Sequence, residues 1–187
     1  WDELNNLAPF IDGYGEKSAG AEFYPHDMTK AEFEAFEHPD KTSLYTLIRR
    51  DDNNHLKVVW YHEAFQKQSE KASKLLKKAA ALADDEGFKN YLTLRAEALL
   101  TDDYFASDMA WLSMKNNLVD IVVGPIENYT DALYGYKAAH ESFVLIKDVE
   151  WSDKLAKYAT FLPKLQKELP VDAIYKQETP GSDVDLN

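Results

Sequence analysis

The sequence contains no cysteine, and none of its apolar runs approaches the roughly 20 residues that a membrane-spanning helix requires. The absence of cysteine excludes disulfides, thiol catalysis and cysteine-bound zinc, but it does not fix the compartment. No segment near the start has the pattern of a signal peptide. We therefore expect a soluble protein, and we assign it no compartment. Trp1 is not a native translation start, so we also expect that the natural protein extends beyond this end.

Positive charge is scarce as well. The chain has 21 Lys and Arg residues against 33 Asp and Glu, which gives a formal net charge of -12 and a pI near 4.8. Such a surface repels phosphate backbones and anionic lipids, and it attracts cations such as ammonium groups. We expect no nucleic-acid partner and no membrane partner. With 45% hydrophobic and 13% aromatic residues in 187 positions, the chain is long enough to bury a core.

The first part of the chain has the apolar spacing of helices. A Thr-x-x-Glu capping box predicts a short helix over about 29–37. Apolar residues at helical spacing predict an amphipathic helix over 62–83, and Asp84–Glu86 and Thr101–Asp103 mark the starts of two more. Because the junctions are short, we expect these three helices to pack as antiparallel neighbours.

The later part changes from helical to strand spacing and back. Val119–Val123 and Ser142–Ile146 are β-branched or apolar runs that predict two strands. A last helix begins near Trp151, and Pro163 inside it predicts a break near Phe161. The expected fold class is α+β and predominantly helical, with antiparallel helices followed by a small antiparallel β element and a further helix, as part of a larger protein.

These patterns divide the chain into five regions. They are an irregular arm at 1–25, a helical region at 26–118, a β segment with a candidate binding motif at 119–148, a helix at 149–176, and a polar connector to a missing region at 177–187.

No catalytic motif stands in the sequence. His-Glu dipeptides at 62–63 and 140–141 resemble half of a zinc motif, but the second histidine that the motif needs is replaced by Gln66 and Val144. A Gly-rich phosphate loop, a Gly-x-Ser-x-Gly elbow and a Nudix-type helix are all absent. We therefore assign no metal ligand and no catalytic residue to this chain.

Carboxylates and tyrosines gather between the two predicted strands. Glu127 and Tyr129 share a face if the chain stays extended past Pro125, and Glu141 joins them if the second strand begins early and pairs nearby. Two carboxylates and a hydroxyl form a binding site for an ammonium group, which we call the amine seat. Alternatively, Glu127 and Asp131 are turn and cap residues and Glu141 is an exposed strand end. The residues alone leave both interpretations open.

The same stretch resembles a known family. GPIENYTDALYGYKAAHESF, residues 124–143, is similar to a segment of the dipeptidyl-peptidase III family of zinc peptidases, which reads Gly-[aromatic or Pro]-Ile-Glu-Thr-Tyr-Arg-Asp, then Gly, then Glu two residues before Phe. FYPHDMT, SLYTLIRR, LLTDDYFASDMAWL and GYKAAHESF resemble, in the same order, a bacterial and plant branch whose plant members are fused to a Nudix domain. The resemblance covers about 20–187.

The resemblance implies a two-lobed peptidase with a wide cleft, in which a His-Glu-x-x-(Gly)-His helix and a further Glu bind zinc. This chain ends before that helix, so zinc is expected in the full-length parent and no cofactor in this fragment. The family's segment holds the free amino terminus of a peptide on the non-zinc side of the cleft. By position these roles fall on Glu127, Tyr129 and Glu141. The implied partners are a peptide with a free N-terminus and the zinc-binding region of the same protein.

Three departures from the family pattern bear on this site. Thr130 stands where the family usually has Arg, one residue is inserted before Gly135, and Ala139 replaces the first of two acids. These changes affect the tightness and register of the amine site, and with them the preference for dipeptide release.

The function we expect is an amino-terminal fragment of a zinc-dependent exopeptidase-like hydrolase that supplies the cleft wall for the peptide N-terminus and is inactive on its own. The alternative is a non-catalytic helical protein-interaction module with an acidic face. A glycosidase that uses a carboxylate pair ranks last, because no Trp platform for a sugar can be placed.

Overall fold

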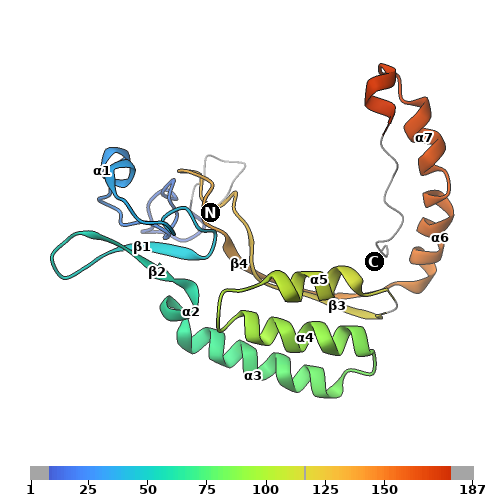
Figure 1. Ribbon diagram of the computed structural model, residues 1–187, viewed down its shortest axis with the longest axis horizontal. Coiled ribbons are helices and arrows are strands. Elements are labelled where there is room, and N and C mark those ends of the chain that lie inside the picture. The colour runs from blue at the N-terminus through green and yellow to red at the C-terminus, as the bar shows by residue number, and fades with distance from the viewer. Residues whose placement is uncertain (1–8, 116, 178–187) are drawn as a thin grey trace.

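The computed structural model describes residues 9–115 and 117–177, and it shows helices with two separate antiparallel hairpins (Figure 1). This confirms the α+β, predominantly helical class. The first eight residues of the expected arm and residues 178–187 of the expected connector lie outside the described residues. The five-region division itself stays a prediction.

The first hairpin was not predicted from the sequence. A short helix, α1 (Lys30–Ala35), is followed by β1 (Thr46–Arg50) and β2 (Leu56–Trp60), which pair antiparallel. Thr29 caps α1 by accepting the N–H of Glu32, as the capping box predicts. The hairpin lies within the region that we expected to be helical. A small apolar cluster joins it to α1, and it consists of Tyr24, Phe33, Ile48 and Leu56.

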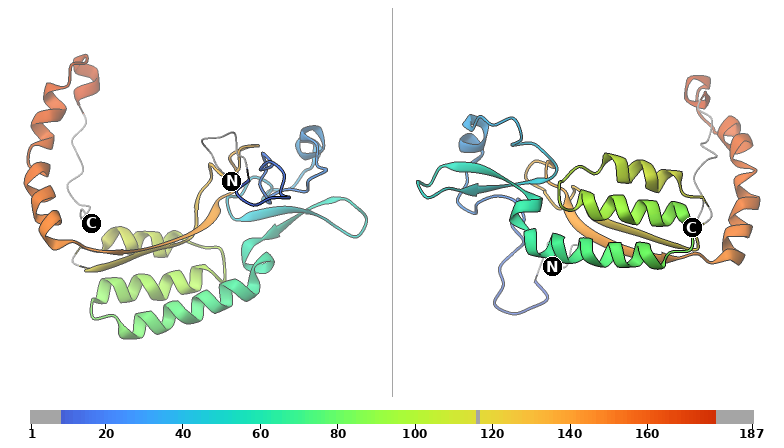
Figure 2. Two further views of the ribbon diagram at one scale, coloured as in Figure 1. Left: turned by 180° about the vertical axis from the view of Figure 1, so that it is seen from behind. Right: turned by 60° about the horizontal axis from the view of Figure 1, so that its bottom comes forward.

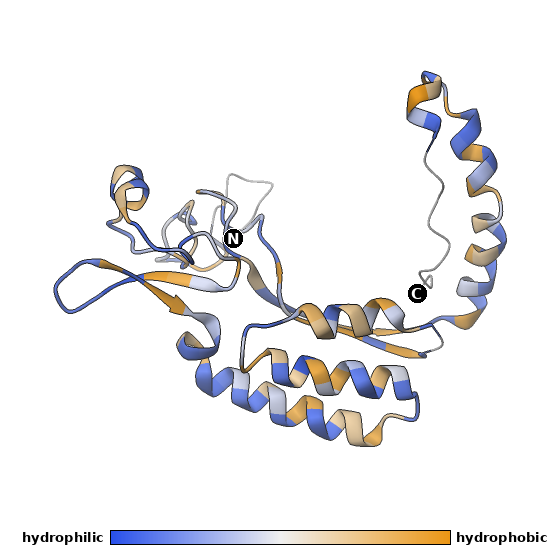
Figure 3. Cartoon of the chain, viewed as in Figure 1, coloured by the Kyte–Doolittle hydropathy of each residue, from blue (hydrophilic) through white to orange (hydrophobic). Residues whose placement is uncertain are grey.

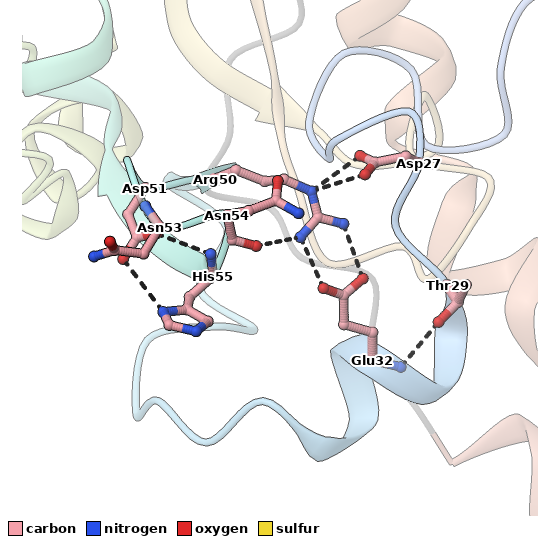
Figure 4. Close-up of polar contacts among 8 residues, drawn as sticks. All are labelled: Asp27, Thr29, Glu32, Arg50, Asp51, Asn53, Asn54 and His55. Carbon is pink, nitrogen blue, oxygen red and sulfur yellow. Dashed lines mark hydrogen bonds and ion pairs between the residues drawn. The ribbon is translucent and has the colours of Figure 1, made fainter.

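Arg50 ties this hairpin to the segment before α1 (Figure 4). Its guanidinium donates to both carboxylate oxygens of Asp27, to both of Glu32 and to the carbonyl of Asn54. The two carboxylates raise the pKa of Arg50, and Arg50 lowers the pKa values of Asp27 and Glu32. The network orders a segment that has little regular structure of its own.

A layer of three helices follows. The predicted helix over 62–83 is divided at Phe65 into α2 (Tyr61–Ala64) and α3 (Gln66–Leu82), because the backbone of Phe65 departs from helical angles (φ -113°, ψ 25°). Then come α4 (Glu86–Ala98) and α5 (Phe105–Ser113), and α3, α4 and α5 lie side by side as expected (Figure 2).

The second hairpin lies against this helical layer. It consists of β3 (Val119–Glu127) and β4 (Ala139–Ile146), which are longer than predicted and pair antiparallel. Ile121 and Val123 pack against the main apolar cluster, and the carboxylate of Asp120 accepts the indole N–H of Trp111 at 3.0 Å. The main cluster is formed by Leu76, Ala80, Tyr91, Leu92, Ala96, Ala98, Leu99, Tyr104 and Met114.

The chain then leaves this body as a helical arm (Figure 1). The arm comprises α6 (Val149–Ala159), α7 (Leu162–Glu168) and the 3-10 turn η1 (Ala173–Lys176), so the break predicted near Phe161 is confirmed. Neither α6 nor α7 contains a buried residue, and apolar positions recur along both helices (Figure 3).

A buried carboxylate organises the loop that joins β3 to β4. Asp131 is 2% exposed and accepts the hydroxyl hydrogen of Tyr24 at 2.7 Å. Burial and this hydrogen bond raise the pKa of Tyr24. The same carboxylate accepts backbone N–H groups from four residues of the loop, which are Leu133, Tyr134, Tyr136 and Lys137.

A buried lysine attaches this loop to the segment before β1. The ammonium of Lys137 donates to the carbonyls of Lys41 and Ser43 and to Oγ1 of Thr46, at 2.7 to 3.0 Å. In addition, the hydroxyl of Tyr61 donates to the carbonyl of Ala138. The loop at 128–138 therefore connects the two hairpins.

We predict that Asp131→Ala lowers the free energy of unfolding by about 3 kcal/mol or more, because it leaves buried N–H and O–H donors without an acceptor. Urea unfolding checks this. Asp52→Ala, at an exposed loop position, is the control and should stay within about 0.5 kcal/mol of the parent. Equal stabilities of the two variants would contradict the anchoring role of Asp131.

A second prediction concerns pH. Burial lowers the pKa of Lys137 from its usual 10.5 to about 8, against the attraction of Asp131. Between these two values the unfolded chain binds the proton that the folded chain has lost, so stability rises with pH. From pH 8 to 10 the protein should gain roughly 1–2 kcal/mol relative to Lys137→Met. Unfolding curves at several pH values measure the difference, and the exposed Lys67→Met should show none.

Candidate functional site

Two of the three predicted site residues lie on the paired strands of the second hairpin. Glu127 ends β3 opposite Ala139, and Glu141 stands on β4 opposite Gly124. Ala139 and Glu141 are two residues apart, so Glu127 and Glu141 are diagonal neighbours across the ladder. In a regular antiparallel pair such neighbours are about 7–8 Å apart. A register irregularity between Pro125 and Glu127 modifies this spacing locally.

Tyr129 lies beyond the end of β3. The chain turns at Asn128, whose carbonyl accepts the N–H of Asp131 at 3.1 Å and whose side-chain amide donates to the carbonyl of Gly135 at 2.7 Å. The period-two argument for a face shared with Glu127 therefore does not reach Tyr129, which is 65% exposed at the turn. The grouping of the three residues stays a prediction.

Pockets lie on two sides of β3 where its pairing becomes irregular. One, of about 380 Å³, lies between α3 and the strands, and Glu141, His140 and Gln68 are among the polar residues that line it. Its apolar wall consists of Phe65, Ala72, Leu99 and Val123. A carboxylate at the edge of an apolar pocket can bind an amine and leave room for the group attached to it.

His140 is a neighbour of Glu141 and takes no part in a zinc motif. Its ring lies 5.1 Å from that of Tyr61 and 5.4 Å from that of Phe65. Desolvation by these surroundings lowers the pKa of His140, which favours the neutral imidazole. No fixed positive charge from His140 therefore competes for Glu141 at neutral pH.

The second pocket, of about 450 Å³, lies between α5 and the other side of β3. Pro125 and Ile126 line it from β3, and Arg95 and Tyr104 line it from the helical layer. Sequence reasoning missed this pocket. Its residues are far apart in the chain, and only an Arg within an otherwise apolar helix face signals it.

The other histidine of the His-Glu dipeptides has a structural role. Asp102, in the left-handed region (φ 59°), accepts the backbone N–H of His62 at 2.9 Å and contacts its Nδ1 at 2.8 Å. The Thr-Asp-Asp run before α5 thus supplies the cap for α2, and its acidic residues were expected only to start the next helix.

A zinc ion does not fit the described residues. Among residues 9–115 and 117–177, no group of three or more His, Asp or Glu side chains is placed to hold a metal ion.

In the same described residues, no helix combines the length and apolar character needed to cross a membrane.

Comparison with known proteins identifies relatives along most of the chain. The model of Peptidase family M49 matches residues 37–180. The structure of DPP III from Caldithrix abyssi is 42% identical, with a TM-score of 0.85 over 97% of this chain and 35% of that one. Dipeptidyl-peptidase III from Corallococcus sp. strain EGB is 34% identical, with a TM-score of 0.74 over 89% of this chain and 32% of that one.

A plant protein is similar as well. Nudix hydrolase 3 of Arabidopsis thaliana is 33% identical over an alignment 188 positions long, which covers 86% of this chain and 24% of that protein. The chain therefore spans between a quarter and about a third of the length of these relatives.

We predict that Gly124→Ala destabilises the attachment of the second hairpin to the helices. Gly124 has a φ of 128°, and an added Cβ would lie 3.3 Å from Cε1 of Tyr104. The expected loss is roughly 2 kcal/mol in the free energy of unfolding. Gly135→Ala is the matched control, because Gly135 also has a positive φ (71°) but no atom within 4 Å of the added Cβ. A loss no larger than that of the control would show that the Tyr104 contact is unimportant.

Proposed function

Because this chain belongs to Peptidase family M49, we propose that it is the amino-terminal part of a zinc-dependent exopeptidase of the dipeptidyl-peptidase III type, and that it supplies the wall of the cleft that binds the free amino terminus of a peptide. The observation that carries the binding role is the diagonal placement of Glu127 and Glu141 across one strand pair. The relatives named dipeptidyl-peptidase III support the type of reaction.

Charge favours this ligand. The amino terminus of a peptide is an ammonium group, and the net charge of -12 attracts it over a distance. Within the site, carboxylates form charge-assisted hydrogen bonds with the ammonium group and fix its position. An exopeptidase has to measure length from this charged end, and groups on a rigid strand pair hold the reference point.

The apolar pocket next to Glu141 gives the ligand a second contact. Its volume of about 380 Å³ and its wall of Phe65, Ala72 and Leu99 suit the first side chain of a peptide. The amine would lie at the polar edge while the side chain is buried beside it. Tyr129, exposed on the adjoining turn, is the proposed hydroxyl partner of the amine.

Bond cleavage belongs to another part of the protein. Family M49 comprises metallopeptidases, whereas the described residues of this chain do not fit a metal ion. We therefore assign no chemical step to this chain. Its own residues bind and orient the peptide, and the zinc-binding region of the same protein is the partner that the proposal requires.

A protein-interaction module remains the second candidate function, and the helical arm is the observation that favours it. Large apolar side chains on α6 and α7 are exposed, including Trp151 (60%), Tyr158 (67%) and Leu165 (56%). Such a surface is typical of a contact with another protein body.

We predict that Glu127→Gln and Glu141→Gln each weaken binding of a short free-amine peptide by about 10- to 100-fold, because each removes one charged acceptor. Calorimetry on the full-length protein that contains this chain, with a zinc-site variant to prevent turnover, measures the affinity. The N-acetylated peptide should bind weakly to every variant. The exposed Glu97→Gln is the control and should bind like the parent.

Equal affinities for the free and acetylated peptides would contradict an amine seat. If full-length protein hydrolyses peptides but Glu127→Gln and Glu141→Gln leave both affinities unchanged, the family's activity stands and the site assignment fails. An interaction module without an amine seat gives neither hydrolysis nor discrimination between the two peptides.

A further inference from the structure

Arg95 is a buried cation with little hydrogen bonding. Its side chain is 5% exposed, and Nη2 donates to Oδ1 of Asp108, whose own side chain is 52% exposed. Nε is buried without a hydrogen-bond partner. Within the described part of the chain, Asp108 is the only carboxylate that pairs with this guanidinium, and the Tyr91 hydroxyl is its other polar neighbour.

Aromatic rings surround the guanidinium but do not replace acceptors. Its central carbon lies 5.1 Å from the ring centroid of Tyr104 and 5.5 Å from that of Tyr91. The hydroxyl of Tyr104 is buried near the carboxylate of Asp102, and burial raises its pKa, so it stays a neutral donor. A guanidinium has five N–H donors, and donors that stay unpaired in a protein interior cost free energy. Arg95 therefore has N–H donors available for a second anion.

The guanidinium of Arg95 lies beside an open pocket. The pocket of about 450 Å³ between α5 and β3 is lined by Arg95, by its partner Asp108 and by aromatic and apolar residues, which are Tyr45, Tyr104, Trp111, Leu112, Val122, Pro125 and Ile126. Nη1 of Arg95 lies 3.5 Å from where a Cβ on Gly124 would be. The same Cβ would lie 3.3 Å from Cε1 of Tyr104, so the backbone of Gly124 packs closely against both side chains.

We propose that this pocket is a binding site for a carboxylate attached to an aromatic or branched apolar group. The planar guanidinium matches the geometry of a carboxylate, and it would donate hydrogen bonds to the carboxylate of the ligand beside that of Asp108. The rings of Tyr45 and Trp111 and the side chain of Leu112 would enclose the apolar part. The size of the pocket falls within the usual range for small-ligand sites, about 300–1,000 Å³.

The proposal does not depend on the amine seat. Its ligand has the opposite charge, and its pocket is lined by α5 rather than by α3. A chain of net charge -12 repels a free carboxylate at a distance, so affinity has to come from contacts inside the pocket. The carboxylate that competes most directly is Asp108, and this gives the proposal a variant that should bind more tightly.

The test uses N-acetyl-L-phenylalanine, which has a carboxylate and no free amine, and its amide, N-acetyl-L-phenylalaninamide. Calorimetry on the full-length protein at pH 7 should show binding of the acid and at least tenfold weaker binding of the amide. Asp108→Asn should tighten binding of the acid by roughly three- to tenfold, because Arg95 then loses its competing anion, and should leave the amide unchanged.

Two further variants should lose binding of the acid or the preference for it. Arg95→Met should abolish the preference for the acid, with circular dichroism as the check on folding. Leu112→Trp fills the pocket from an exposed position on α5 and should abolish binding of the acid without touching the buried pair. The proposal is overturned if acid and amide bind equally, if neither binds saturably, or if Asp108→Asn binds the acid no better than the parent does.

Discussion

The buried carboxylate of Asp131 is the interaction on which the candidate site depends. It accepts the Tyr24 hydroxyl from the amino-terminal segment and backbone N–H groups from the loop between β3 and β4. A carboxylate is expensive to remove from water unless donors surround it, so the loop has few arrangements that satisfy it. Lys137, six residues later, carries the same constraint to the segment before β1 through three oxygen acceptors. Contacts that span about a hundred residues of sequence thus give the loop one conformation.

This constraint sets the geometry of both pockets. The loop fixes the ends of β3 and β4, and the packing of Ile121 and Val123 fixes their middle against the helices. Glu127 and Glu141 are then held by backbone pairing, which leaves only their side chains free to adjust. Positioning on a strand pair is more precise than positioning on a loop, which is why Tyr129 at the turn is the least constrained member of the proposed amine seat.

Sequence patterns predicted the features of the fold that depend on interactions between residues close together in the chain. The capping box before α1, the helical spacing over 62–83 and the break near Phe161 correspond to observed features, because each depends on neighbours within a few residues. β1 and β2 were missed because their strands are short and polar residues interrupt them. Glu127 and Glu141 could be named from the family segment, whereas Asp131 was expected only as a turn or cap residue. Arg95 and its pocket had no clear signal, since the pocket needs residues from 45 to 126 to meet.

The two pockets show how one acidic chain can select groups of opposite charge. The net charge of -12 acts through the solvent and fades over about 8 Å at physiological ionic strength, so it influences the approach of a ligand more than its bound state. Within about that distance of the surface, an approaching ammonium group is attracted and a carboxylate is repelled. Inside the pocket the nearest charges dominate, because the local dielectric is lower. There Glu141 lines the pocket on the α3 side of β3, and Arg95 lines the pocket on the α5 side. Added salt would therefore weaken amine binding and relieve the repulsion of a carboxylate, so the salt dependence of the two sites should have opposite signs.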